Sequence, residues 1–75
     1  MSKFVTQEYK GEVKSVNLEY VGEINKITWK EPDGFIIEFA FHGLCITRVF
    51  FRYPTEESRD EALKMVLTVS QGTAV

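Results

Sequence analysis

Apolar and polar residues alternate along the chain as far as Tyr53, a period of two that is typical of strands with one buried face. The segments KGE, VGE, EPDG and HGL interrupt the alternation with glycine or proline, which tight turns favour. The opposite parity of Val13 and Val16 predicts a β-bulge near Lys14 or Ser15. The pattern predicts five strands, over residues 3–9, 13–20, 24–30, 35–41 and 45–53. Their short separators indicate antiparallel neighbours in a meander.

The hydrophobic period changes after Tyr53, and the new pattern predicts a helix over residues 56–71. Thr55 is the expected N-cap, and Gly72 is the expected stop. The apolar stripe at i, i+3 and i+4 spacing comprises Ala62, Leu63, Val66, Leu67 and Ser70. The predicted fold class is therefore α+β, an antiparallel meander of about five strands with one C-terminal helix packed on one face.

The strand registers follow from the requirement that apolar side chains of neighbouring strands share a face. In this scheme Phe41 lies opposite Cys45, and residues 42–44 form a loop. The other expected neighbours are Phe39 and Thr47, Ile37 and Val49, Phe35 and Phe51, Trp29 and Phe35, Ile27 and Ile37, Leu18 and Ile27, and Val16 and Trp29. These registers place a row of alternating charge on the opposite face, made of Glu19, Lys26, Glu38 and Arg48.

One helix is too narrow to cover the inner face of such a sheet. Five strands span about 24 Å at roughly 4.8 Å spacing, whereas a helix is about 10 Å across. Either the sheet curls around the helix in a half-closed monomer, or a second molecule covers the remainder. The outer face is also apolar, because Ile36, Ala40, Ile46 and Phe50 flank the charge row. Apolar patches of this kind commonly mark contact surfaces.

Length and composition place the chain among small folded domains. It has 75 residues, a net charge of −2 and a single cysteine, so no internal disulfide can form. A cysteine-poor chain without a secretory signal or a membrane-length apolar run fits a cytoplasmic protein, or a phage protein acting in the cytosol. The acidic balance gives no overall attraction to nucleic acid or to anionic membranes.

Catalytic, metal and cofactor motifs are absent from the sequence. His42 and Cys45 are the single histidine and the single cysteine, and no third group identifies them as a nucleophile pair. They fall short of the three or four ligands that zinc requires. The five glycines are spread one to a turn and form no phosphate-binding loop. We therefore expect a protein without enzymatic activity, metal or cofactor.

The sequence leaves two interpretations of function open. The first is a protein-interaction module or a small regulator or inhibitor, which forms a homodimer or binds a larger protein. Its contact surface would be an uncovered apolar sheet face or an edge strand, with contact residues Ile36, Ala40, Ile46, Arg48, Phe50 and Arg52. The alternative is a single-stranded nucleic-acid-binding module, because Arg48, Phe50 and Arg52 interleave cations with an aromatic ring on one face.

Overall fold

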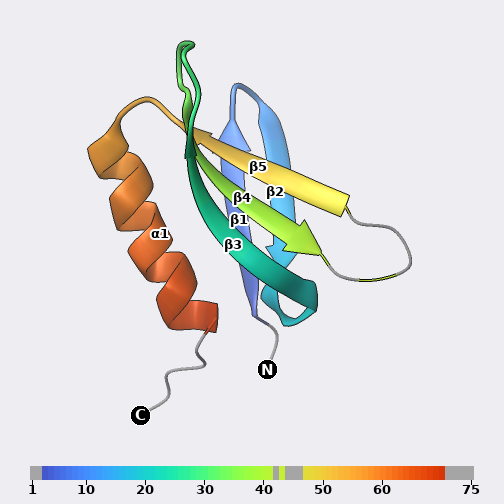
Figure 1. Ribbon diagram of the computed structural model, residues 1–75. Coiled ribbons are helices and arrows are strands. Elements are labelled where there is room, and N and C mark those ends of the chain that lie inside the picture. The colour runs from blue at the N-terminus through green and yellow to red at the C-terminus, as the bar shows by residue number, and fades with distance from the viewer. Residues whose placement is uncertain (1–2, 42, 44–46, 71–75) are drawn as a thin grey trace.

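The computed structural model describes residues 3–41, 43 and 47–70. It contains five antiparallel strands in two sheets and one C-terminal helix (Figure 1), so the expected α+β class is confirmed. The elements in chain order are β1 (Phe4–Tyr9), β2 (Glu12–Asn17), the 3₁₀ turn η1 (Leu18–Tyr20), β3 (Val21–Thr28), β4 (Phe35–Phe41), β5 (Thr47–Tyr53) and α1 (Glu56–Ser70).

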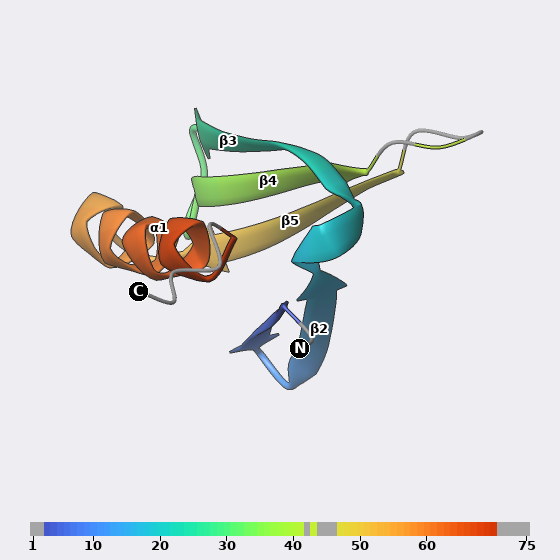
Figure 2. The ribbon, with the colours of Figure 1, turned by 90° about the horizontal axis from the view of Figure 1, so that it is seen from below.

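The 3₁₀ turn η1 divides the strands into two sheets. The side chain of Asn17 accepts a hydrogen bond from the Glu19 N–H at 3.0 Å, which ends β2 and redirects the chain. β1 and β2 form a hairpin, and β3, β4 and β5 form a three-stranded sheet with β4 in the centre. Figure 2 shows the hairpin beyond β5, on the opposite side of this sheet from β3. The expected pairing of the second strand with the third is therefore wrong, for Leu18 and Ile27 and for Val16 and Trp29.

The hairpin pairs without interruption from Phe4 and Asn17 to the turn. The bulge expected near Lys14 or Ser15 is wrong, because the parity of the two valines has a simpler cause. Val16 is buried on the inner face of the hairpin, whereas Val13 is 62% exposed on its outer face. The register shift in the structure lies at the start of β3 instead.

The pairing of β4 with β5 keeps the expected faces but not the expected partners. Phe41 pairs with Thr47 rather than with Cys45, so every pair is displaced by two residues. A shift of two leaves the parity unchanged, because side chains alternate with period two. The observed pairs on the inner face are Phe35 and Tyr53, Ile37 and Phe51, Phe39 and Val49, and Phe41 and Thr47.

The pairing of β3 with β4 differs from the expected register by one residue. Ile27 pairs with Ile36, and the Trp29 N–H donates to the Gly34 carbonyl oxygen at 2.7 Å. The turn closes one residue earlier than expected because Asp33 adopts a φ of 57°. A slip of one residue moves every side chain to the other face. The expected pairs of Trp29 with Phe35 and of Ile27 with Ile37 are therefore wrong.

The expected charge row is present only at one end. Arg48 Nε lies 3.3 Å from Glu38 Oε2, which confirms that ion pair. Lys26, however, pairs with Ile37 across the sheet and forms an ion pair with Asp60 of α1 at 3.8 Å. Asn25 takes its place and donates to Glu38 at 2.9 Å, because the one-residue slip exchanges the two neighbours.

The inner face of the three-stranded sheet is covered from two sides, by α1 and by the hairpin. The rings of Phe39 and Phe51 meet edge to face at its centre, with centroids 4.8 Å apart. The buried core cluster comprises Val16, Leu18, Ile37, Phe39, Phe51 and Val66. Because the hairpin supplies Val16 and the 3₁₀ turn η1 supplies Leu18, the part of the face that one helix cannot reach is covered within the chain.

Helix α1 begins as expected and buries one side chain that the apolar stripe does not predict. The Ser58 N–H donates to Thr55 Oγ1 at 3.1 Å, which confirms Thr55 as the N-cap. Arg59 is 1% exposed, and it donates to the Ile27 carbonyl oxygen at 3.1 Å and to Asp60 Oδ1 at 2.7 Å. These bonds fix the start of the helix against β3 and satisfy the buried guanidinium.

We expect Gly34→Ala to destabilise the fold by roughly 1–3 kcal/mol, because the added methyl group overfills a closed turn. A Cβ at this position would lie 2.2 Å from the Trp29 carbonyl oxygen. Urea unfolding of the variant and the parent protein measures the difference. Gly11→Asn is the control, since nothing lies within 4 Å of a Cβ there and asparagine tolerates a positive φ. Equal losses in both variants would contradict the prediction.

Candidate protein-interaction surface

Five of the six contact residues expected from the sequence belong to the outer face of the three-stranded sheet, namely Ile36, Ala40, Arg48, Phe50 and Arg52. Ile36 and Ala40 are buried there, at 0% and 5% exposure. Phe50 and Arg52 are partly exposed and Arg48 is exposed, whereas Ile46 lies outside the described residues. Ile36 and Ala40 are therefore covered within the chain, and the exposed part of this face combines Arg48 and Arg52 with the rings of Phe50 and Trp29.

Trp29 explains why Ile36 is buried. The Trp29 ring lies 5.3 Å from that of Phe50, and the Arg52 guanidinium lies 5.3 Å from the Trp29 ring centroid. Trp29 follows β3 and the other two residues belong to β5, so their contact crosses over β4 between them. Ile36 is the β4 residue paired with both Ile27 and Arg52, directly below this crossing.

Both arginines of this face are paired with acidic groups. Arg52 bonds the Glu31 carboxylate through Nη2 and donates through Nε to the Asp33 carbonyl oxygen at 3.3 Å. Arg48 is paired with Glu38 at 3.3 Å. These pairs offset the positive charge that a phosphate backbone would require.

The outer edge of β5 is partly occupied by side chains of the hairpin. The Gln7 amide donates to the Arg52 carbonyl oxygen at 2.6 Å and accepts from the Arg52 N–H at 3.0 Å. Lys14 Nζ donates to the Phe50 carbonyl oxygen at 2.9 Å. The Gln7 side chain therefore replaces a neighbouring strand at Arg52, and this edge is poorly suited to pairing with another molecule.

The described part of the chain carries an apolar groove between β1 and α1. Its volume is about 300 Å³, and residues of β5 also line it. In Figure 1 and Figure 2, β1 is the hairpin strand nearer to α1. The groove is lined by Phe4, Val5, Thr6, Phe51, Tyr53, Ala62, Met65, Val66 and Val69, none of which carries a charge at neutral pH.

Large apolar side chains stand exposed around this groove. Met65 is 72% exposed, Phe4 is 54% exposed and Val69 is 37% exposed. Lys3 Nζ donates to the Ser70 carbonyl oxygen at 3.4 Å and so ties the start of β1 to the end of α1. Burial raises the pKa of the Tyr53 hydroxyl, which therefore stays protonated and neutral. We name the groove and these three exposed residues the groove face.

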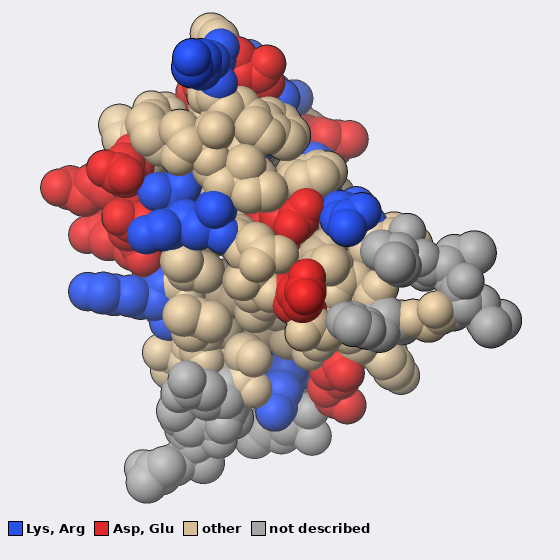
Figure 3. Space-filling view, viewed as in Figure 1, with Lys and Arg blue, Asp and Glu red and all other residues tan. Residues whose placement is uncertain are grey.

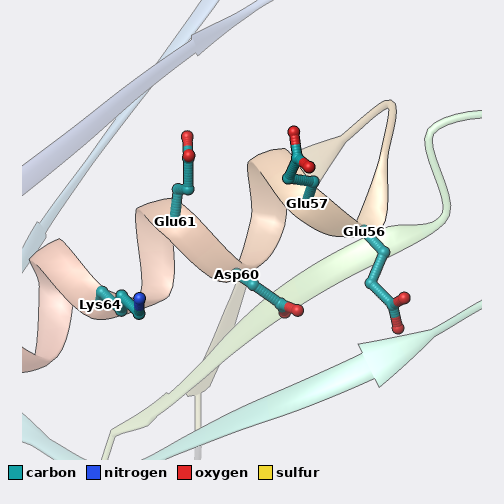
Figure 4. Close-up of a pocket in the computed structure, with 5 residues that line it drawn as sticks. All are labelled: Glu56, Glu57, Asp60, Glu61 and Lys64. Atoms are coloured by element: carbon teal, nitrogen blue, oxygen red, sulfur yellow. The ribbon is translucent and has the colours of Figure 1, made fainter.

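The solvent side of α1 is acidic at its N-terminal half. Figure 3 shows acidic side chains gathered over the upper part of the helix, which is its N-terminal half. Figure 4 shows that they diverge, since Glu57 and Glu61 point to one side of the helix and Glu56 and Asp60 point to the other. Diverging carboxylates do not form a chelating set. Among the described residues, no group of three or more His, Cys, Asp or Glu is placed to hold a metal ion.

We expect the stabilising effect of Asp60 to depend on pH. The hydrogen bond from Arg59 lowers the pKa of Asp60, and Lys26 lowers it further. Because the folded-state pKa lies below the unfolded-state value of about 3.9, Asp60 stabilises the fold above that pH and loses this effect as the pH falls through the folded-state pKa.

Asp60→Asn should therefore destabilise the protein at about pH 6 and have a smaller effect at about pH 2.5. Urea unfolding at both pH values measures the difference in the free energy of unfolding between the variant and the parent protein. Glu57→Gln removes an exposed carboxylate from the same end of the helix and controls for the loss of one negative charge. If Asp60→Asn lowered the free energy of unfolding equally at both pH values, the lowered pKa of Asp60 would be contradicted.

His42 and Cys45, the pair considered for nucleophilic chemistry, both lie outside the described residues. Over the described ranges, no helix combines the length and the apolar character needed to cross a bilayer. Comparison of the chain with protein-family models, with curated proteins and with solved structures finds no match.

The groove face was not predicted from the sequence, although its helix residues leave a signal in the hydrophobic pattern. Met65 and Val69 are four residues apart and lie beside the apolar stripe. They were a usable signal, since a helix packed on one sheet needs no second apolar row. Phe4 and Val5 gave no signal, because nothing in the period-two pattern places the first strand beside the helix.

Proposed function

We propose that this protein is a non-enzymatic interaction module that binds other protein through its groove face, and that the occupant is a second copy of the same chain. The observation that carries the proposal is the uncharged groove between β1 and α1, with Phe4, Met65 and Val69 exposed around it. Interface cores are enriched in aromatic residues and methionine and depleted in charge, which matches this lining. Burial of such a patch also adds stability to a small domain.

A second copy fits the groove because the same face carries both the hollow and the projecting side chains. In a two-fold dimer, each molecule presents the same patch to the other, so the patch must be complementary to itself. Met65 projects with 72% exposure at a groove that is open to solvent. A two-fold dimer through this face would bury the exposed Met65 of each copy.

Val69→Glu should weaken self-association by about 2 kcal/mol, or roughly thirty-fold, because it places a charge in an apolar interface. Leu67→Glu is the matched control. It introduces the same charge two residues away, at a position with similar exposure, 41% against 37%, that does not line the groove. Light scattering and sedimentation equilibrium over a series of dilutions measure the mass of each protein.

A parent protein that stays monomeric at every concentration would contradict self-association. Equal weakening by Val69→Glu and Leu67→Glu would place the contact outside the groove. Circular dichroism of both variants at the working concentration shows whether either has lost the fold. A dimer in which only the Val69 variant dissociates supports the proposal.

The second candidate function is binding of single-stranded nucleic acid on the outer face of the three-stranded sheet. The observation in its favour is that Trp29 joins Phe50 and Arg52, so that an exposed ring system lies beside Arg48 and Arg52. Bases stack on such rings. It ranks second because both arginines are paired with Glu31 and Glu38.

Titration with a fluorescently labelled oligothymidine at low and at moderate salt tests this second function. If it holds, binding falls with salt, and Trp29→Ala and Arg52→Glu each weaken it by about 1–3 kcal/mol. Val13→Ala removes an exposed apolar residue from the hairpin and should leave binding unchanged. The absence of binding at low salt would exclude this function.

A further inference from the structure

One edge of β1 carries backbone groups that no strand among the described residues satisfies. The Leu18 N–H donates to the Lys3 carbonyl oxygen at 2.8 Å, so Lys3 faces β2. Backbone groups of successive residues in an antiparallel strand point to alternate sides. The N–H and C=O groups of Phe4, Thr6 and Glu8 therefore point away from β2.

These outward groups lie along the apolar groove. Phe4 and Thr6 both line it, and β1 has β2 as its single partner strand among the described residues. No hydrogen bond from the described part of the chain reaches the outward N–H or C=O of either residue. A ligand that buries this groove must satisfy these groups, because a buried backbone group without a partner costs free energy. Another strand does so directly.

We infer that the second copy joins this edge as a strand, so that β1 pairs with β1 of the second copy in antiparallel fashion about a two-fold axis at Val5. This inference rests on the proposed self-association through the groove face. The dimer then contains a continuous four-stranded sheet, with the two hairpins side by side. In this register Phe4 and Thr6 of each copy exchange N–H···O=C bonds with Thr6 and Phe4 of the other.

The side chains fit this register on both faces of the new sheet. Val5 lies opposite Val5 of the second copy, on the inner face of the hairpin that also carries Val16. On the other face Phe4 lies opposite Thr6 of the second copy, an aromatic and β-branched pair of the kind that stabilises sheets. Lys3 lies opposite Gln7, so no like charges face each other among these pairs.

The other edges are less suited to the same pairing. The β5 edge is occupied by Gln7 at Arg52 and by Lys14 at Phe50. The hollow between β2 and β5 is lined by Lys14 and Arg48, and charged side chains at an edge oppose strand pairing. The β3 edge carries Lys26, whose side chain lies on the inner face of the sheet, and inward charges on edge strands oppose pairing.

Proline substitution at two facing positions tests the inference. Thr6→Pro removes an N–H that points into the groove and leaves the bonds between β1 and β2 intact. Ser15→Pro is the matched control. Ser15 pairs with Thr6, its hydroxyl lies 3.2 Å from that of Thr6, and its N–H points to the outer edge of β2. Both variants lose the same side-chain contact, and only one alters the β1 edge.

We expect Thr6→Pro to weaken the dimer at least tenfold and Ser15→Pro to change it less than threefold, as measured by sedimentation equilibrium. Equal dimerisation of both variants and the parent would overturn the strand pairing and leave the proposed function intact. A monomeric parent protein would overturn both.

Hydrogen exchange on the parent protein gives a second measurement that needs no variant. The amides of Phe4 and Thr6 should exchange at least tenfold more slowly at concentrations where the dimer dominates than after dilution to the monomer. The Ser15 amide should show no such difference. If either proline variant fails to fold, the exchange rates of the Phe4 and Thr6 amides test the inference on the parent protein alone. Rapid exchange of both amides in the dimer would overturn the inference.

Discussion

The packing of Phe39 against Phe51 is the interaction on which the rest of the fold depends. The two rings lie on neighbouring strands, and neither strand can shield them, because they project from the same face of the sheet. Helix α1 covers them from one direction and the β1–β2 hairpin from another. Two covering elements with different orientations leave a seam between them, and the groove between β1 and α1 is that seam. The candidate interaction surface is thus a consequence of how the core is covered.

Hydrogen bonds from side chains, rather than pairing between strands, hold the β1–β2 hairpin against β5. The amide of Gln7 binds the backbone of Arg52 on both its N–H and its C=O, and Lys14 binds the neighbouring Phe50 carbonyl oxygen. These bonds hold the hairpin against β5 without making it part of the same sheet. They also leave the outward edge of β1 unused, because the hairpin meets β5 through its inner side chains. The open groove and the unused edge therefore have one structural origin.

The sequence predicted the order and type of the elements, because alternation and helical periodicity report directly on burial. It predicted the shared face of Ile37, Phe39, Val49 and Phe51, which depends on parity alone. It did not predict the pairing partner of Trp29. A large aromatic residue in an apolar pattern suggested the core, whereas the ring covers Ile36 on the outer face beside Arg52.

The hydrophobic pattern also did not predict that the strands divide into two sheets. It depends on the Asn17 side chain that ends β2, a local hydrogen bond that the period-two pattern does not reveal. The groove face was missed for the same reason, since its position follows from where the hairpin lies. Local bonds at Asn17 and Gln7 therefore decided the features that the hydrophobic pattern left open.

The ion pair formed by Lys26 and Asp60 bears on how large the proposed assembly can become. If each molecule had two edge strands that could pair with another copy, copies would add without limit and form fibrils. Lys26 places a positive charge on β3, the edge strand opposite the hairpin. Its ion pair with Asp60 keeps this charge on the inner face, where a strand added to β3 would need an apolar surface. With β1 as the proposed pairing edge, the opposite edge is closed to a further strand, and the proposed assembly ends at two molecules.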